Sequence, residues 1–444
     1  MTRTSRWLVL LAGPLLAACV HVLLPENYVG TDGLTRELSA GARSAAALTV
    51  WMALWWITEV IPVYVTALLP LVLFPLLGTT TVTAAASSYG DPLIFLFFGG
   101  FVLALAIERW GLHRRLAMTV LRFVGPRPDH ILAAFMAITA FISFWVTNTA
   151  TTLMMLPVAL SVIDTLEESA GAGKGADSPV RPLATALLLG VAYAASIAGM
   201  GTVIATAPNV FAASFISNQL GKEISFLGWM IMAMPVVGLM LAAMWVWFAR
   251  FQFRLGSEPL PGARAVLYGL SQGLGPVTPA ERRTAVVFLL TAAAWVLRGL
   301  LGDVTIAGIA PFAGLTDPGI AVSAAIILFI VPAGMGKPGE ALIDWPTATR
   351  VPWGVLLLFG GGLALAAAFQ ATGLADFLAA QGRVLAGMPQ WLLVACVVAA
   401  VVFLSEIASN TAAATTVIPV LSALAIGAGL EPAPLVLAAC LAAS

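Results

Sequence analysis

Long apolar runs fill most of this sequence and leave little polar surface for a water-soluble fold. Of its 444 residues, 60% are apolar and 9% are charged, and the mean hydropathy is +1.00, whereas soluble domains carry about 25% charged residues. A helix needs about 20 apolar residues to cross a bilayer, so we predict an all-α polytopic membrane protein. The runs comprise residues 7–24, 44–78, 92–107, 131–163, 183–216, 227–249, 285–301, 319–335, 351–369, 391–426 and 432–444.

The charged and sulfur-bearing residues argue against several other classes of protein. The 21 Lys and Arg balance 21 Asp and Glu and form no basic clusters, so we expect no nucleic-acid partner. Cys19, Cys396 and Cys440 lie inside apolar runs and are expected to be small buried hydrophobes. No nucleophile with its base, metal-ligand set or soluble sensor domain is evident, so a membrane enzyme or receptor is the weaker alternative.

Two of the runs have lengths that suit neither one membrane crossing nor two. Residues 131–163 and 391–426 are too long for one crossing and short for two of about 20 residues each. Their polar centres read Thr147-Asn148-Thr149 and Ser409-Asn410-Thr411. Each run therefore predicts a re-entrant helical hairpin whose tip lies at membrane depth. Non-helical backbone is tolerated there only inside protein or a wet cavity, so the two tips predict a binding site.

The two halves of the chain are duplicates. An offset of 262 residues relates several polar and glycine positions, which indicates an internal repeat. With the hairpins returning to their own sides, 16 of the 21 Lys and Arg fall on the N-terminal side of the membrane. This asymmetry predicts a cytoplasmic N-terminus and an inverted-topology repeat, as in many secondary transporters. The matched pairs include Gly111 with Gly373, Ser143 with Ser405, Asn148 with Asn410, and Pro157 with Pro419.

The repeat also predicts the domain organisation. The run 183–216 is interrupted at Gly199-Met200-Gly201-Thr202, where glycine disfavours a helix, so we expect a broken transmembrane helix. Beyond the hairpins the offset is 248 residues and places Ser444 opposite Ser196, so the second repeat is expected to be truncated before its own unwound loop and final helix. The expected parts are a first transmembrane helix and outer loop (1–43); a first inverted repeat (44–250) with scaffold helices 44–127, hairpin 128–167 and a broken helix with the following helix 181–250; a cytoplasmic linker (251–284); and an incomplete second repeat (285–444) with scaffold helices 285–370, hairpin 386–426 and the start of a broken helix 432–444.

The polar tips suit an anion bound together with cations. Hydroxyls and carboxamides donate to carboxylates and supply oxygen ligands to a hard cation, and the helix that follows each tip directs its positive end toward an anion. Lys and Arg are absent from 128–173, from 182–221 and after Arg383, so helix ends and bound cations would have to balance an anionic substrate. This pattern predicts cation-coupled symport.

Simpler roles exist for the same residues. Hydroxyls in membrane helices often bond back to their own backbone, and an Asn can join two helices without any ligand. The duplication at one offset favours a binding role. Glu406, beside the second tip, is either a proton or cation site or a partner in a hydrogen bond within the hairpin, and the sequence favours neither.

The motifs resemble those of one known family. The Thr147-Asn148-Thr149 and Ser409-Asn410-Thr411 tips, each followed by threonines and a proline, resemble the duplicated Ser-Asn-Thr signatures of the divalent anion/sodium symporter family. The stretches 56–62 and 201–209 are similar to other parts of that family, and the resemblance covers nearly the whole chain. Thr147 stands where the family usually has Ser, and Ala205 and Ala207 stand where Gly and Pro are usual.

The resemblance implies eleven helices and two hairpins, a homodimer in the lipid of the inner (plasma) membrane, and a transport domain that moves as an elevator against a fixed scaffold. It implies no organic cofactor, sodium as the coupling ion, and a small anionic substrate. Two residue sets carry over by motif. The substrate-binding set is Thr147, Asn148, Thr149, Gly201, Thr202, Ser409, Asn410 and Thr411, and the sodium-binding set is Ser143, Thr147, Asn148, Gly199, Ser405, Ala408 and Asn410.

The leading hypothesis is therefore sodium-coupled symport of succinate-like di- or tricarboxylates by an elevator mechanism. A dicarboxylate exchanger or a sulfate transporter of the same family stays open as an alternative. So does an ion antiporter or arsenite-type permease of the wider superfamily, and so does coupling to protons instead of sodium.

Overall fold

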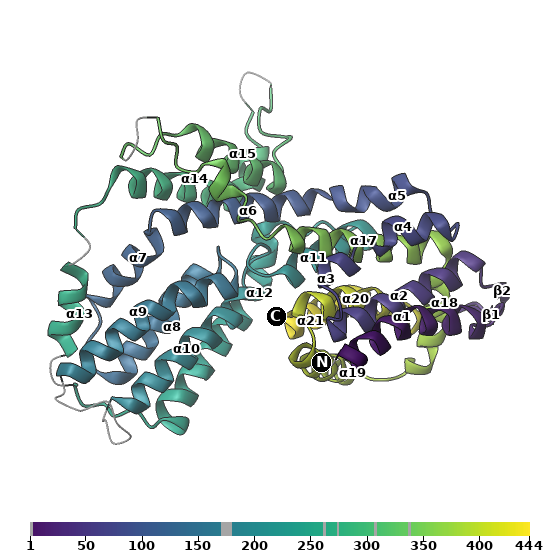
Figure 1. Ribbon diagram of the computed structural model, residues 1–444, viewed down its shortest axis with the longest axis horizontal. Helices are drawn as coiled ribbons and strands as arrows, with labels where there is room; N and C mark the ends of the chain where they lie inside the picture. The colour runs from purple at the N-terminus through teal and green to yellow at the C-terminus, as the bar shows by residue number, and fades with distance from the viewer. Residues whose placement is uncertain (1–2, 170–179, 261–262, 273–274, 306–308, 336–338) are drawn as a thin grey trace. The chain divides into compact units, whose positions relative to one another are not determined.

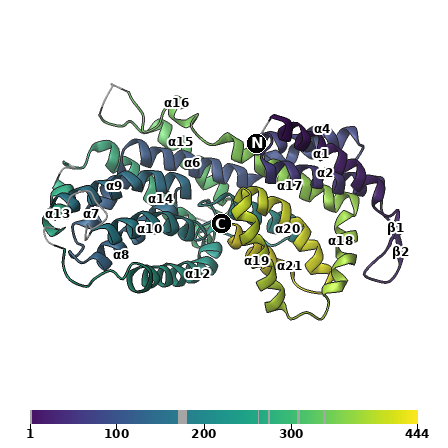
Figure 2. The ribbon, with the colours of Figure 1, turned by 60° about the horizontal axis from the view of Figure 1, so that its bottom comes forward.

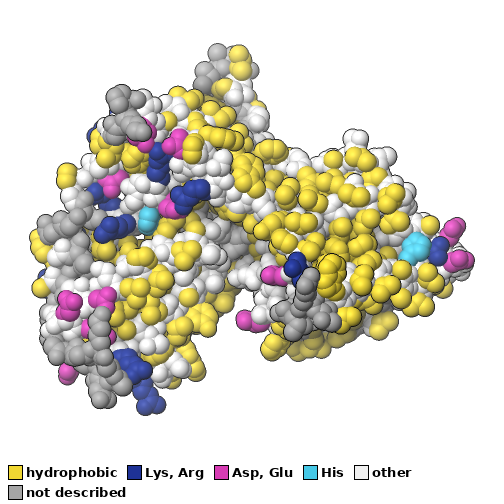
Figure 3. All heavy atoms as spheres, viewed as in Figure 1, with side chains coloured by type: hydrophobic (Ala, Val, Ile, Leu, Met, Phe, Trp, Pro, Cys, Tyr) yellow, Lys and Arg dark blue, Asp and Glu magenta, His cyan; other side chains and the backbone are white. Residues whose placement is uncertain are grey.

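The computed structural model describes residues 3–169, 180–260, 263–272, 275–305, 309–335 and 339–444, and their regular secondary structure is almost entirely helical (Figure 1). Within them, nine helices are long and apolar enough to cross a membrane. The prediction of an all-α polytopic membrane protein is confirmed. On the face drawn in Figure 3, hydrophobic side chains cover much of the visible surface, and large residues such as Leu153, Leu289 and Phe403 are exposed. Such surfaces are typical of proteins that a bilayer surrounds.

The chain folds into two compact units, each assembled from separate stretches of sequence. Unit 1 comprises Met1–Phe95, Ala207–Ile224 and Pro352–Ser444, and unit 2 comprises Leu96–Thr206 and Ser225–Val351. Helix α6 (Pro92–Arg109) begins in unit 1 and continues in unit 2. Residues from both predicted repeats, 44–250 and 285–444, therefore contribute to both units.

Unit 1 contains the second hairpin and the two strands. Its core packs Trp56 and Phe74 against Leu358 and Phe369. Helix α19 is joined to α20 through Ala408 and Ser409 alone, and α20 packs beside α18 and α21 (Figure 2). The elements are α1 (Arg3–Leu23), β1 (Asn27–Val29), β2 (Thr35–Glu37), α2 (Ala40–Thr58), α3 (Val63–Thr66), α4 (Leu69–Leu76), α5 (Val82–Ser87), the 3₁₀ turn η1 (Ser88–Gly90), α11 (Ala207–Leu220), α17 (Trp353–Thr372), α18 (Leu374–Gly382), the 3₁₀ turn η3 (Arg383–Leu385), α19 (Gln390–Ile407), α20 (Asn410–Gly427) and α21 (Pro432–Ala443).

Unit 2 contains the first hairpin. Its core includes Phe135, Met155 and Leu187, one each from α8, α9 and α10. Gly190 lets α10 approach α8, because a β-carbon there would lie 2.8 Å from the Leu132 side chain. Besides the rest of α6, the elements are α7 (Leu112–Leu121), α8 (Pro128–Ser143), α9 (Asn148–Ser169), α10 (Arg181–Gly199), α12 (Phe226–Val246), the π-helical turn η2 (Trp247–Gln252), α13 (Ala263–Gln272), α14 (Pro279–Gly302), α15 (Asp317–Ile330) and α16 (Trp345–Ala348).

One pair of glycines related by the predicted repeat has the same backbone conformation. Gly111 separates α6 from α7 with φ +68°, and Gly373, 262 positions later, separates α17 from α18 with φ +79°. Both lie in the left-handed region, which glycine enters without steric cost. Each long helix therefore turns sharply at a glycine before the short helix that precedes a hairpin.

Some elements differ from the sequence-based expectation. Within the predicted outer loop, β1 and β2 form a short antiparallel hairpin that pairs Asn27 with Glu37. All three cysteines are free, but Cys19 and Cys396 are exposed and only Cys440 is buried, so the expectation of burial is wrong for two of them. Their helices, α1 and α19, present apolar faces outward, and apolar sequence in a membrane protein does not distinguish a lipid-facing position from a core position.

Candidate functional site

The first hairpin turns at a four-residue tip in unit 2. Helix α8 ends at Ser143, residues 144–147 make the turn, and α9 begins at Asn148. The Thr147 carbonyl accepts the Thr151 amide at 2.8 Å, which closes the first turn of α9. Because the first amides of a helix have no partner within it, α9 directs free N–H groups and its positive end toward the tip.

Polar oxygens gather where the tip meets the end of α10. The buried Ser143 hydroxyl donates to the Ala195 carbonyl at 2.8 Å and lies 3.3 Å from Asn148 Oδ1. Helix α10 ends at Gly199, so its carbonyl end, which carries partial negative charge, lies beside these two side chains. Hydroxyl, carboxamide and carbonyl oxygens are the ligands that a hard cation prefers.

Gly199 is required for this arrangement. A β-carbon on Gly199 would lie 2.2 Å from Asn148 Oδ1 and 2.7 Å from Thr206 Cγ2, closer than non-bonded atoms approach. Gly201 is similarly constrained, because its β-carbon would lie 2.7 Å from the Phe144 ring. Gly199 and Gly201, which were predicted to interrupt the helix, therefore permit close approach of the unwound backbone to the hairpin tip.

The predicted break in the transmembrane helix is present between α10 and α11. Residues 200–206 are non-helical, and two of their hydrogen bonds reach other elements of unit 2. The buried Thr202 hydroxyl donates to the Phe144 carbonyl at 2.5 Å, and Trp229 Nε1 of α12 donates to the Met200 carbonyl at 2.9 Å. The unwound loop is thus fixed to the tip on one side and to α12 on the other.

The second tip, in unit 1, uses its hydroxyls differently. Ser405 donates to the Val402 carbonyl at 2.9 Å, and Thr415 donates to the Thr411 carbonyl at 2.9 Å, so both bond back to their own helices. Asn410 is exposed at the start of α20 and Thr411 is buried. Glu406 is also exposed and makes no hydrogen bond with the described residues, which argues against the alternative of a hydrogen bond within the hairpin.

The structure therefore assembles one part of the predicted site. It brings together Ser143, Asn148, Gly199, Gly201 and Thr202, and places the half-buried Thr147 and the exposed Thr149 on the same tip. Ser405, Ala408, Ser409, Asn410 and Thr411 lie together on the other tip, in the other unit. A site shared by the two tips stays a prediction.

The sequence did not single out an ion pair near the first tip in which the carboxylate is buried and the guanidinium is partly buried. Asp317, only 4% exposed, lies 3.0 Å from Arg298 and accepts the Phe226 amide at 2.9 Å. Arg298 lies within α14. The residues Thr316-Asp317-Pro318 form a typical helix start, so the sequence indicated a cap rather than a partner for Arg298.

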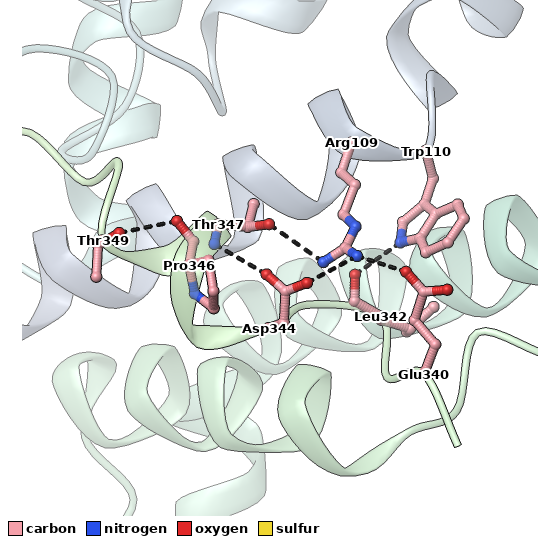
Figure 4. Close-up of polar contacts among 8 residues, drawn as sticks. All are labelled: Arg109, Trp110, Glu340, Leu342, Asp344, Pro346, Thr347 and Thr349. Atoms are coloured by element: carbon pink, nitrogen blue, oxygen red, sulfur yellow. Dashed lines mark hydrogen bonds and ion pairs between the residues drawn. The ribbon is translucent and has the colours of Figure 1, made fainter. Parts of the chain in front are cut away.

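A second polar network, drawn in Figure 4, joins the end of α6 to the segment between α15 and α17. Arg109 contacts Glu340 at 2.6 Å, Asp344 at 2.9 Å and the Thr347 hydroxyl at 3.2 Å. The Thr347 hydroxyl and amide, with Arg109, lower the pKa of Asp344 to about 2. All of these groups pair with one another, and we assign the network to stability within unit 2.

The amino-acid sequence is similar to a known family and to curated relatives. Residues 6–444 match the family model described as the sodium:sulfate symporter transmembrane region. A sodium-dependent dicarboxylate transporter (SdcS) of Staphylococcus saprophyticus is 35% identical over 436 residues, which is 98% of this chain and 81% of the relative. A sodium-dependent dicarboxylate transporter (SdcS) of Staphylococcus aureus is 38% identical over 401 residues, covering 90% of this chain and 76% of the relative.

These matches confirm two expectations, the family resemblance and the assignment to a transporter rather than an enzyme. The matched segment includes both hairpins, the broken helix and the cluster around Asn148. The chain belongs to the sodium:sulfate symporter family, the divalent anion/sodium symporter family whose tip signatures its sequence carries.

Proposed function

We propose that this protein is a sodium-coupled symporter that imports small dicarboxylates of the succinate type across the plasma membrane. The observation that carries the proposal is the close approach of Gly199 to Asn148, which places a carboxamide oxygen between the start of α9 and the end of α10. The sodium-dependent dicarboxylate transport named for the two staphylococcal relatives supports the same substrate and coupling ion.

In this proposal the first sodium ion binds at the oxygen cluster beside α10. Ser143 and Asn148 supply side-chain oxygens, Thr147 adds a hydroxyl, and the backbone at Gly199 supplies the negative end of α10. Ser405, Ala408 and Asn410 form part of a second sodium site at the other tip.

The substrate carboxylates bind next to the sodium ions. The N-terminal ends of α9 and α20 offer amide groups and positive dipole ends to the anion. Neither tip carries Lys or Arg, so bound sodium supplies the remaining positive charge. Binding of sodium therefore precedes binding of the anion, which couples the two fluxes. The residues that contact the anion are Thr147, Asn148, Thr149, Gly201, Thr202, Ser409, Asn410 and Thr411.

The remaining features of the proposal concern the whole transporter. We place the N-terminus in the cytoplasm on the basis of the Lys and Arg distribution, and the tips at membrane depth. A homodimer embedded in lipid moves the substrate by an elevator motion. The glycine turns at Gly111 and Gly373 support this motion, because each begins the short helix that leads to a hairpin.

Uptake into proteoliposomes tests the function. Labelled succinate is expected to accumulate when an inward sodium gradient is present and not when choline replaces sodium. Asn148→Ala should abolish uptake, whereas Thr165→Ala should not, because Thr165 lies on the same helix but bonds back to Ser161 at 2.7 Å. Uptake that requires internal dicarboxylate and ignores the sodium gradient would instead establish an exchanger. Absence of succinate uptake together with accumulation of sulfate or citrate would change the substrate class.

A further inference from the structure

A stack of aromatic rings lies against the tip of the first hairpin. The Trp145 indole is nearly parallel to the Trp295 indole, with centroids 6.4 Å apart and an interplanar angle of 11°, and stacks on Phe226 at 6.0 Å and 22°. Phe288 meets the same indole edge-on at 4.9 Å. Phe226 and Trp295 also stack on each other at 4.7 Å. The tip thus packs, through Trp145, on aromatic residues of α12 and α14.

Asp317 accepts hydrogen bonds from both residues on whose rings Trp145 stacks. Its carboxylate Oδ2 accepts the backbone amide of Phe226 at 2.9 Å, and its backbone carbonyl accepts Trp295 Nε1 at 3.1 Å. Arg298 contacts the same Oδ2 at 3.0 Å and balances the buried charge. One residue at the start of α15 therefore fixes α12 and α14 at the level of the tip.

Trp145 is also close in the chain to the proposed sodium ligands. Trp145 is three residues before Asn148 and follows Phe144, whose carbonyl accepts the Thr202 hydroxyl. Four residues form the whole turn between α8 and α9, so we expect a change in the packing of Trp145 to reach Asn148 through this short stretch of backbone.

The chemistry of Asp317 is better explained by a role in positioning neighbouring residues than by a contribution to the stability of the fold. Asp317 Oδ1 is buried and has no hydrogen-bond partner among the described residues, so this carboxylate is only half satisfied. Buried ion pairs contribute little net stability relative to apolar residues, because desolvation offsets their attraction. A buried charge retained at that cost is explained by a geometric role.

We propose that Asp317 is a positioning residue for the first sodium site, acting through Arg298 and the stack of Phe226, Trp295 and Trp145. The proposal rests on the proposed sodium-coupled function. The anchored stack keeps the tip in the shape that brings Asn148 Oδ1 to Gly199 before sodium binds, so part of the ordering cost is removed from the binding step. Loosening the stack therefore weakens sodium binding, while the substrate ligands themselves remain.

The test uses the full chain with five substitutions. Trp145→Ala removes the stacking ring, Trp145→Phe keeps a ring, and Asp317→Asn removes the charge of the anchor. Trp247→Ala is the matched aromatic control, because Trp247 stacks on Phe251 at 5.7 Å in η2. Glu108→Gln is a second control, which removes the charge from a more exposed ion pair, because Glu108 lies 2.7 Å from Arg350.

Two measurements are made for each variant. Sodium-dependent succinate uptake in proteoliposomes gives the sodium concentration for half-maximal rate and the maximal rate. Sodium-dependent thermal stabilisation of the purified protein, with choline as the reference, reports sodium binding without transport. We expect the half-maximal sodium concentration to rise about tenfold in Trp145→Ala and about fivefold in Asp317→Asn. Trp145→Phe and both controls should stay within about twofold, and the maximal rate should change by less than about threefold.

The outcomes separate this proposal from the proposed function. Unchanged sodium dependence in folded Trp145→Ala would overturn the positioning role, and so would additive effects in the Trp145→Ala, Asp317→Asn double variant, which we expect to match Trp145→Ala alone. If Asp317→Asn does not fold, Arg298→Lys takes its place, with the same expected rise and the same overturning result. If sodium stabilises the wild-type protein against heat but the protein transports no succinate, the proposed function is overturned. The thermal measurement on the variants still decides the positioning role in that case.

Discussion

A β-carbon on Gly199 would lie 2.2 Å from Asn148 Oδ1, so the end of α10 and the start of α9 can meet only with glycine at this position. Gly199→Ala must push the carboxamide away, and we expect loss of more than about 90% of sodium-driven uptake. Gly238→Ala is the matched control, because a β-carbon on Gly238, within α12, would have no atom within 4 Å. Normal uptake by folded Gly199→Ala would contradict the assignment of this contact to the sodium site.

The Ser143 hydroxyl joins α8 to α10 and lies beside Asn148. Ser143→Ala removes the hydrogen bond to the Ala195 carbonyl and one proposed sodium ligand. Loss of one such bond costs about 1 kcal/mol of stability. We expect a lower thermal midpoint and a half-maximal sodium concentration raised several-fold. A lowered midpoint with unchanged sodium dependence would leave Ser143 with a structural role only.

Replacing Asn410 or Ser405 of the second tip with Ala is expected to reduce uptake to different extents. The exposed Asn410 side chain is proposed to bind substrate and sodium, so Asn410→Ala should abolish uptake and leave the thermal midpoint unchanged. Ser405 bonds back to Val402, so Ser405→Ala should reduce uptake less severely. Uptake measured beside size-exclusion profiles checks both. Loss of folding in Asn410→Ala would support helix joining as the role of this residue.

Acid should weaken the Arg109 network only at low pH. The pKa of Asp344 is lowered from 3.8 to about 2 by the Thr347 hydroxyl and amide and by Arg109. Because the folded-state pKa lies below the ordinary value, the stabilisation is complete above about pH 4 and is lost as the pH falls toward 2. Asp344 is 45% exposed, so solvent limits the contribution to less than about 1 kcal/mol. Thermal midpoints from pH 7 to 3 should fall less in Asp344→Asn than in wild type, and parallel curves would refute the assignment.

Close helix packing in unit 1 depends on Gly361. A β-carbon there would lie 2.4 Å from the Ala67 carbonyl oxygen, a backbone atom that cannot move aside easily. We expect Gly361→Ala to destabilise the protein by about 1–3 kcal/mol, the range for overpacked cores. The thermal midpoint measured against Gly238→Ala checks this, and equal midpoints would show that α17 has room to shift.

Much of the helical framework could be predicted from the lengths of the apolar runs and from the polar residues that interrupt them. The run 131–163 became α8 and α9 with their turn at residues 144–147, and the glycines at 199 and 201 marked the end of α10. These features are local, because they depend on how many apolar residues occur in succession and on where glycine or a polar group interrupts them. The strands β1 and β2 were not expected, because three-residue strands leave little pattern to recognise.

The amino-acid sequence by itself determined the membrane class, the hairpins, the broken helix and the residue types at the tips, since these depend on neighbours in the chain. Only the tertiary structure showed that Gly199 must be small because of Asn148, and that Asp317 pairs with Arg298 and anchors the rings beneath Trp145. Those relations join residues from several different helices. Contacts of that kind arise from how helix faces meet in space, so the spacing of residues along the chain does not predict them.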